Sequence, residues 1–98
     1  MKADKILAKI KGANDKFGVD PTSLLIVDYV VENWKSGEVT IMNLLEGFWR
    51  TSPATTHTYL KKLIAKKILV SKQSKEDARR KHIEKGAKFD DFIAYMEE

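Results

Sequence analysis

Apolar residues recur at helical spacing along four stretches of this chain, with polar and charged residues between them. A period of three to four residues is typical of an amphipathic helix with one buried face, so each stretch predicts a helix. The stripes are Ile6, Leu7, Ile10, Ala13 and Phe17 over residues 3–16; Leu24, Val27, Val30, Val31 and Trp34 up to about residue 35; Ile41, Leu44, Leu45 and Phe48; and Phe89, Phe92, Ile93 and Met96. The pattern predicts a mainly α-helical fold.

Capping residues and glycines mark where these helices begin and end. Gly18 is expected to end or bend the first helix, and Asp20 and Pro21 suit the cap and the first position of the second. Gly37 is a natural stop, because glycine readily adopts the left-handed conformation in which many helices finish. Residues 38–40 are then expected to form a short strand.

A further helix, at about residues 53–67, carries the most informative pattern. Ser52 can cap it, and Pro53 fits its first position, where a missing N–H costs nothing. One side should face a core and carries Thr56, Leu60, Leu63 and Ile64, whereas the other carries Ala54, Thr55, His57, Thr58, Lys61 and Lys62. Small residues allow close approach to a DNA major groove, and hydroxyls can bond phosphates or base edges. From this helix alone, an ordinary solvated face is an equally good interpretation.

The segment after this helix favours nucleic-acid binding. Residues 68–72 predict a strand, residues 73–78 are polar and turn-prone, and residues 79–84 can return as a basic strand anchored by Ile83. The strand expected before the third helix can pair with this hairpin. The order helix, strand, polar tip and basic strand predicts a winged helix-turn-helix, with the wing at about residues 71–84.

Residues 51–84 resemble the DNA-binding core of the MarR-type winged-helix regulators. The resemblance rests on a recognition helix that begins with Ser52-Pro53, on the Lys-rich turn and apolar strand that follow it, and on an Asp-x-Arg element at Asp77 and Arg79. It implies that Arg79 reaches toward the minor groove and that Asp77 orients it. It also implies a homodimer. The apolar stripes of the first and last helices favour one as well, although the alternative is that they pack on each other and complete the core.

Some positions depart from the family pattern or need separate interpretation. Thr56 stands where a hydrophobic residue is usual, and Thr58 where a basic one is common. Tyr59 is expected to pack its ring against the core. Trp34 and Trp49 are expected to lie in or near the core, because large aromatic side chains mostly bury area.

The positive charge of the chain is concentrated on the predicted helix and wing. The net charge is +4, but residues 50–85 hold 11 Lys or Arg and 3 Asp or Glu, a local charge of +8. A basic patch that coincides with a predicted reading element is the expected footprint of nucleic-acid binding, although a solvated Lys-rich surface is the alternative.

Composition limits the remaining classes of protein. Ninety-eight residues, 43% of them hydrophobic, predict one domain with a modest core: an N-terminal helix in 1–20, a winged-helix core in 21–85 and a C-terminal helix in 86–98. There is no Cys, so disulfides and thiolate metal sites are excluded. No secretory signal or membrane-spanning stretch is evident, so a cytoplasmic protein is expected.

Catalysis finds little support in the sequence. His57 and His82 are the only histidines, and neither has an acid or Cys partner at the spacing of a metal site. There is no phosphate-binding Gly-rich loop and no nucleophile motif. We therefore expect no enzyme activity, no cofactor and no bound metal.

These observations predict a sequence-specific transcriptional regulator that binds double-stranded DNA. The expected DNA-binding residues are Ser52, Thr55, His57 and Thr58 at bases or phosphates, Lys61, Lys62, Lys72 and Lys75 at phosphates, and Arg79 with Arg80 or Lys81 at the minor groove. The alternative is a winged-helix module whose basic face docks on an acidic protein partner, because a fold does not determine a function. RNA binding is a weaker third interpretation, since no stacking aromatics alternate with the basic residues.

Overall fold

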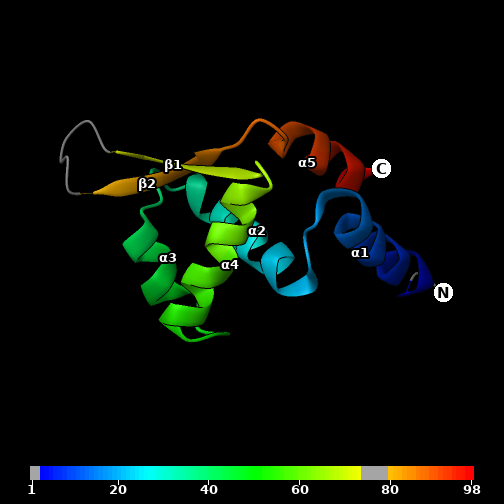
Figure 1. Cartoon of the computed structure of the whole chain (residues 1–98), viewed down its shortest axis with the longest axis horizontal. Helices are drawn as coiled ribbons and strands as arrows, with labels where there is room; N and C mark the ends of the chain where they lie inside the picture. The colour runs from blue at the N-terminus through cyan, green and yellow to red at the C-terminus, as the bar shows by residue number, and fades with distance from the viewer. Residues whose placement is uncertain (1–2, 74–79) are drawn as a thin grey trace.

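The computed structural model of the chain describes residues 3–73 and 80–98. Within them the helices are α1 (Ala3–Phe17), α2 (Pro21–Trp34), α3 (Ile41–Gly47), α4 (Pro53–Ala65) and α5 (Phe89–Glu97), and the strands are β1 (Leu69–Gln73) and β2 (Lys81–Lys85). The antiparallel strands project from one end of the molecule, whereas α1 and α5 lie together at the other end (Figure 1). Helix α4 packs against both α2 and α3. This is the mainly α-helical winged helix that the sequence predicts, and none of the described helices is long and apolar enough to cross a membrane.

Three of the predicted capping and stop signals act at the ends of α1, α2 and α4. The Asp20 carboxylate accepts a hydrogen bond from the Ser23 N–H at 2.8 Å, which caps α2. The Ser52 hydroxyl likewise accepts one from the Thr55 N–H at 3.3 Å, which caps α4. Gly18 follows the last residue of α1 with φ of +70°, a left-handed conformation that glycine adopts without steric cost.

Helix α4 ends two residues earlier than predicted, in a motif that needs a left-handed residue. Lys67 has φ of +64°, and its N–H donates to the Ile64 carbonyl at 3.0 Å. The Ile68 N–H donates to the Leu63 carbonyl at 3.1 Å. This pair of bonds is the Schellman motif, in which glycine usually holds the left-handed position. Because lysine stands there instead, no glycine in the sequence marks the residue at which the helix ends.

The base of the wing is tied to the body of the protein. The strand register pairs Leu69 with Lys85, Ser71 with Ile83 and Gln73 with Lys81. The strand expected before α3 is reduced to one bridge between Thr40 and His82, beside which the Ile83 N–H donates to the Val39 carbonyl at 2.8 Å. The Trp34 indole N–H donates to the Ile83 carbonyl at 3.0 Å. Ile83 is itself buried, as predicted, so β2 is anchored by both its side chain and its backbone.

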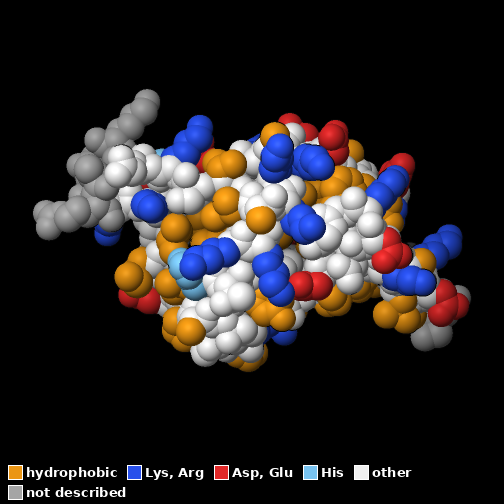
Figure 2. Space-filling model, viewed as in Figure 1, with side chains coloured by type: hydrophobic (Ala, Val, Ile, Leu, Met, Phe, Trp, Pro, Cys, Tyr) orange, Lys and Arg blue, Asp and Glu red, His pale blue; other side chains and the backbone are white. Residues whose placement is uncertain are grey.

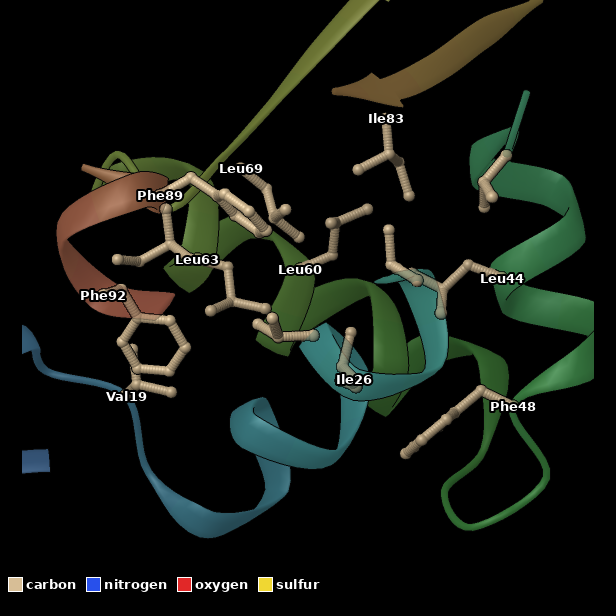
Figure 3. Packing of buried hydrophobic residues seen from close by; sticks show 14 of the residues in the cluster. Val19, Ile26, Leu44, Phe48, Leu60, Leu63, Leu69, Ile83, Phe89 and Phe92 are labelled. Atoms are coloured by element: carbon tan, nitrogen blue, oxygen red, sulfur yellow. The ribbon is translucent and has the colours of Figure 1, made fainter. Parts of the chain in front are cut away.

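The hydrophobic core lies where α2, α3, α4, α5 and β2 meet, and Leu60 and Leu63 of α4 lie at its centre (Figure 3). The buried hydrophobic residues are Ala13, Val19, Ile26, Val27, Val30, Val39, Leu44, Phe48, Leu60, Leu63, Ile68, Leu69, Ile83, Phe89 and Phe92. Helices α1 and α5 pack on each other through Phe17 and Phe92, whose ring centroids are 5.4 Å apart. The stripe of α1 is only partly used in this way, because Ile6 and Leu7 remain exposed.

The prediction for one of the two tryptophans is wrong. Trp34 packs against the core as expected, but Trp49 is 82% exposed. Helix α3 ends at Gly47, and the next residue, Phe48, turns into the core, where its ring lies edge-on to Tyr29. Trp49 follows the end of the helix, so a helical period cannot predict which way it faces.

Candidate nucleic-acid interface

Helix α4 has the two faces that its sequence predicts. Thr56, Leu60 and Leu63 are buried and face the core. Tyr59 is half-buried against the core, as expected, with Lys62 Nζ lying 4.8 Å from its ring centroid. The predicted DNA-binding residues of the other face, Ser52, Thr55, Thr58, Lys61 and Lys62, are all exposed, and His57 is half-buried. The structure therefore brings these residues to one surface, with His57 the least accessible of them.

Hydroxyl groups cluster at the N-terminal end of this surface. The Ser52 hydroxyl donates to the Thr55 hydroxyl at 3.0 Å, and the Thr58 hydroxyl donates to the Ala54 carbonyl at 3.1 Å. Each hydroxyl oxygen has two acceptor positions, so these bonds leave the exposed oxygens able to accept from a DNA base or a water.

A buried hydroxyl network fixes the start of α4 from the core side. Thr56 is fully buried, and its hydroxyl donates to the Ser52 carbonyl at 3.0 Å. The Thr51 hydroxyl lies 2.5 Å from the same Thr56 oxygen. A buried polar group costs little free energy when it is hydrogen-bonded, which explains a threonine where the MarR pattern has a hydrophobic residue. The network joins the turn before α4 to the first turn of the helix.

Ionisable side chains at the base of the wing form a connected group. Lys72 Nζ lies 3.6 Å from the Glu84 carboxylate, which also contacts Nε2 of His82. The other ring nitrogen of His82, Nδ1, lies 3.3 Å from the Glu38 carboxylate. The hydrogen bond with His82, together with the charge of Lys72, holds the pKa of Glu84 below its usual value. Glu38 and Glu84 were not predicted. No local motif marks Glu38, which reaches His82 from another part of the chain, whereas Glu84 lies two residues from His82 on the same face of β2.

Positive charge covers α4 and the wing at the surface. The lysines and arginines of residues 50–85 that the structure describes are all exposed: Arg50, Lys61, Lys62, Lys66, Lys67, Lys72, Arg80, Lys81 and Lys85. Figure 2 shows lysine and arginine side chains with a histidine over α4, whereas acidic and basic side chains are mixed over α5 and the neighbouring end of the molecule. The uneven charge of the sequence is thus also uneven in space.

Three predicted site residues, Lys75, Asp77 and Arg79, lie outside the described residues. Arg80 and Lys81 are exposed at the start of β2, where they line a surface hollow together with the beginning of α3. Among the residues that the structure describes, no group of three or more His, Asp or Glu side chains could hold a metal ion.

Solved structures share this arrangement of helices and wing. The S. aureus MepR–DNA complex matches 97% of this chain with a TM-score of 0.73 and 20% sequence identity. The chain has the MarR-like winged-helix fold. The transcription regulator MarR from Oenococcus oeni PSU-1 matches 97% of it with a TM-score of 0.68 and 25% identity, and another MarR structure matches 89% with a TM-score of 0.66 and 14% identity.

This MarR-like chain spans 67% of the MepR chain, 72% of the O. oeni chain and 61% of the other MarR chain. No family model and no curated protein sequence matches it. The O. oeni protein is a transcription regulator, and MepR was solved as a DNA complex.

Proposed function

We propose that this chain is a sequence-specific transcriptional regulator that binds double-stranded DNA, with α4 in the major groove and the wing at the minor groove. The observation that carries the proposal is the exposed face of α4, where hydroxyls at the N-terminal turn are followed by Lys61 and Lys62. This face lies on the same fold as MepR, which was solved in complex with DNA. The first turn of a recognition helix contacts base edges, so small side chains there permit close approach.

Each part of the surface has a distinct role under this proposal. Ser52, Thr55, His57 and Thr58 meet base edges or nearby phosphates, whereas Lys61, Lys62, Lys72 and Lys75 contact the phosphate backbone. Lys72 is shared with Glu84 and so contributes less than the two α4 lysines. Arg79, oriented by Asp77 and joined by Arg80 or Lys81, lies at the minor groove, where a narrow A·T tract is most negative.

The regulator acts as a homodimer of single-domain chains under the same proposal. Ile6 and Leu7 of α1 are 59% and 64% exposed, which leaves apolar surface that a second copy can cover. A symmetric dimer carries two recognition helices about one turn of DNA apart and therefore selects a near-palindromic site. An Ile6→Asp, Leu7→Asp double variant should sediment as a monomer at concentrations where the native chain is a dimer. An unchanged sedimentation coefficient would show that α1 is not part of the dimer interface.

The deciding experiment is binding to a random-sequence duplex pool and to a matched single strand, at low and near-physiological salt, followed by selection of the bound duplexes. Steeply salt-dependent binding that enriches a near-palindromic sequence is the expected result. Absence of duplex preference at low salt would contradict the proposal and favour a protein–protein module whose basic face meets an acidic partner.

Lysine variants separate phosphate contacts from base reading. Lys61→Ala and Lys62→Ala should each weaken binding to all duplexes alike and lower the slope of log affinity against log salt by about one. Lys35→Ala is the matched control, because Lys35 is equally exposed but pairs with Glu32 at the end of α2. Equal effects of all three variants would indicate general charge attraction instead of a defined interface.

A further inference from the structure

The turn between α3 and α4 exposes an aromatic side chain next to the proposed reading helix. Trp49 is 82% exposed, and Met42 nearby is 60% exposed. The guanidinium of Arg50 lies 5.2 Å from the centroid of the Trp49 ring. Hydrophobic side chains gather on this lower part of the molecule in Figure 2, where Figure 1 shows the α3–α4 turn. An exposed tryptophan stacked with an arginine is the kind of pair that anchors binding surfaces.

Trp49 shares a surface hollow with the start of α4. This hollow, of about 460 Å³, is lined by Met42, Leu45, Glu46, Phe48, Trp49, Thr51 and Pro53. Thr51 and Pro53 flank Ser52, the first residue of the proposed DNA-binding face. The hollow and the indole ring that borders it therefore adjoin the start of the proposed DNA-binding face.

We infer that Trp49 and Arg50 belong to the DNA interface, where Trp49 packs against deoxyribose at the edge of the groove that α4 enters and Arg50 pairs with the adjoining phosphate. This inference rests on the proposed function. The apolar carbon surface of a sugar suits an indole ring, and the phosphate beside it suits the guanidinium. Glu46 is the one carboxylate among the residues that line this hollow, whereas Arg50 lines a second hollow on the other side of Trp49 together with Asp28 and Glu32. These carboxylates oppose the approach of a phosphate, and Glu46 is the one on the α4 side.

Such a contact positions α4 without reading bases, so its loss has a characteristic signature. Trp49→Ala should weaken binding about fivefold, to the selected site and to random duplexes alike, because packed apolar surface is lost. Arg50→Ala should weaken binding and lower the salt slope by about one, and Glu46→Gln should strengthen binding about twofold. Asn14→Ala is the control, since Asn14 is exposed on α1, outside the hollows that Trp49 borders, and should leave affinity unchanged.

Tryptophan fluorescence gives a direct readout of whether DNA covers the ring. Trp34 is half-buried with its indole N–H bonded to the Ile83 carbonyl, so acrylamide should quench mainly Trp49 in the native chain. Addition of the random-sequence duplex pool should lower acrylamide quenching of the native chain. The Trp49→Phe variant, which retains only Trp34, should show no such protection.

The possible outcomes separate this inference from the proposed function. Duplex binding with unchanged quenching and an unaffected Trp49→Ala variant would overturn the inference while the proposed function stands. Absence of duplex binding would contradict both the inference about Trp49 and Arg50 and the proposed function. Protection of Trp49 that rises with protein concentration in the absence of DNA would show that a second copy covers the ring, and this result would also overturn the inference.

Discussion

The carbonyl group of Lys67 lies directly against Gly86. A Cβ atom on Gly86 would stand 2.2 Å from the Lys67 carbonyl oxygen and 2.8 Å from the Ile68 carbonyl carbon. The Gly86 N–H donates to the Ile68 carbonyl, and the Lys88 N–H donates to the Lys67 carbonyl, both at 2.9 Å. The turn that ends α4 and the turn that leads from β2 to α5 are thus joined backbone to backbone, which orients the wing relative to α4.

Gly86→Ala should destabilise the protein by about 3 kcal/mol, because the added methyl group overlaps backbone that cannot rotate away. Urea unfolding followed by circular dichroism measures the change. Ala87→Ser is the control at the neighbouring exposed position and should stay within about 0.5 kcal/mol of the native chain. Similar values for the two variants would mean that the turns separate easily.

Lys67→Gly should stabilise the protein by about 0.5 kcal/mol. The left-handed conformation at φ of +64° costs a lysine more than a glycine, and this gain exceeds the entropy that glycine adds to the unfolded chain. Lys66→Gly, one residue earlier at φ of −85°, lacks that gain and should destabilise instead. Thermal unfolding of the two variants should give shifts of opposite sign, and shifts of the same sign would contradict this account of the α4 terminus.

Much of the fold follows from local signals in the sequence, and the failures occur where local signals end. Ser52 and Asp20 act through atoms three residues away, so their capping could be predicted from sequence alone. Lys67 occupies a glycine position without being glycine, and Trp49 lies beyond the end of a helical period, so both were misjudged. The Lys67 backbone is held by hydrogen bonds with Ile64 and Lys88, and Trp49 stays exposed where the preceding Phe48 turns into the core.

Part of the candidate site can likewise be predicted from the sequence, and part of it cannot. The outer face of α4 follows from a 3.6-residue period, which places Thr55 and Lys62 on one side and Leu60 on the other. The contact of His82 with Glu38 joins residues that are distant in the chain, and only the fold brings them together. Sequence patterns therefore predict which residues a helix exposes, but they do not predict which partners a wing residue has.

Acidification should weaken the base of the wing through Glu84. The pKa of Glu84 is lowered in the folded chain, chiefly by its hydrogen bond with His82, so its contribution to stability is present above the pKa of the unfolded chain. That contribution is lost as the pH falls through the lower pKa of the folded chain, in a window below about pH 4.3. Unfolding measured from about pH 6 downward through this window should show a smaller pH dependence in Glu84→Gln than in the native chain.

Carboxyl NMR titration of Glu84 tests the cause of this shift. His82→Leu, which leaves no hydrogen-bond donor at this position, should raise the pKa of Glu84 more than Lys72→Ala does, because the hydrogen bond with His82 is the larger influence and the charge of Lys72 a smaller one. The reverse order would assign the lowered pKa to the Lys72 charge.

The Thr51–Thr56 hydroxyl pair should show energetic coupling and should affect DNA binding without touching DNA. Thr56→Val should cost about 1 kcal/mol or more, because it loses both the bond with Thr51 and the bond to the Ser52 carbonyl. A double-mutant cycle with Thr51→Val should give a coupling energy of about 0.5–1.5 kcal/mol, because the bond between the two hydroxyls is lost in either single variant. Thr58→Val is the exposed control and should change stability by less than about 0.5 kcal/mol.

Since Thr56 is fully buried, any duplex affinity that Thr56→Val loses must come from displacement of the start of α4. Additive unfolding energies, or full duplex affinity in Thr56→Val, would show that this network does not position the helix.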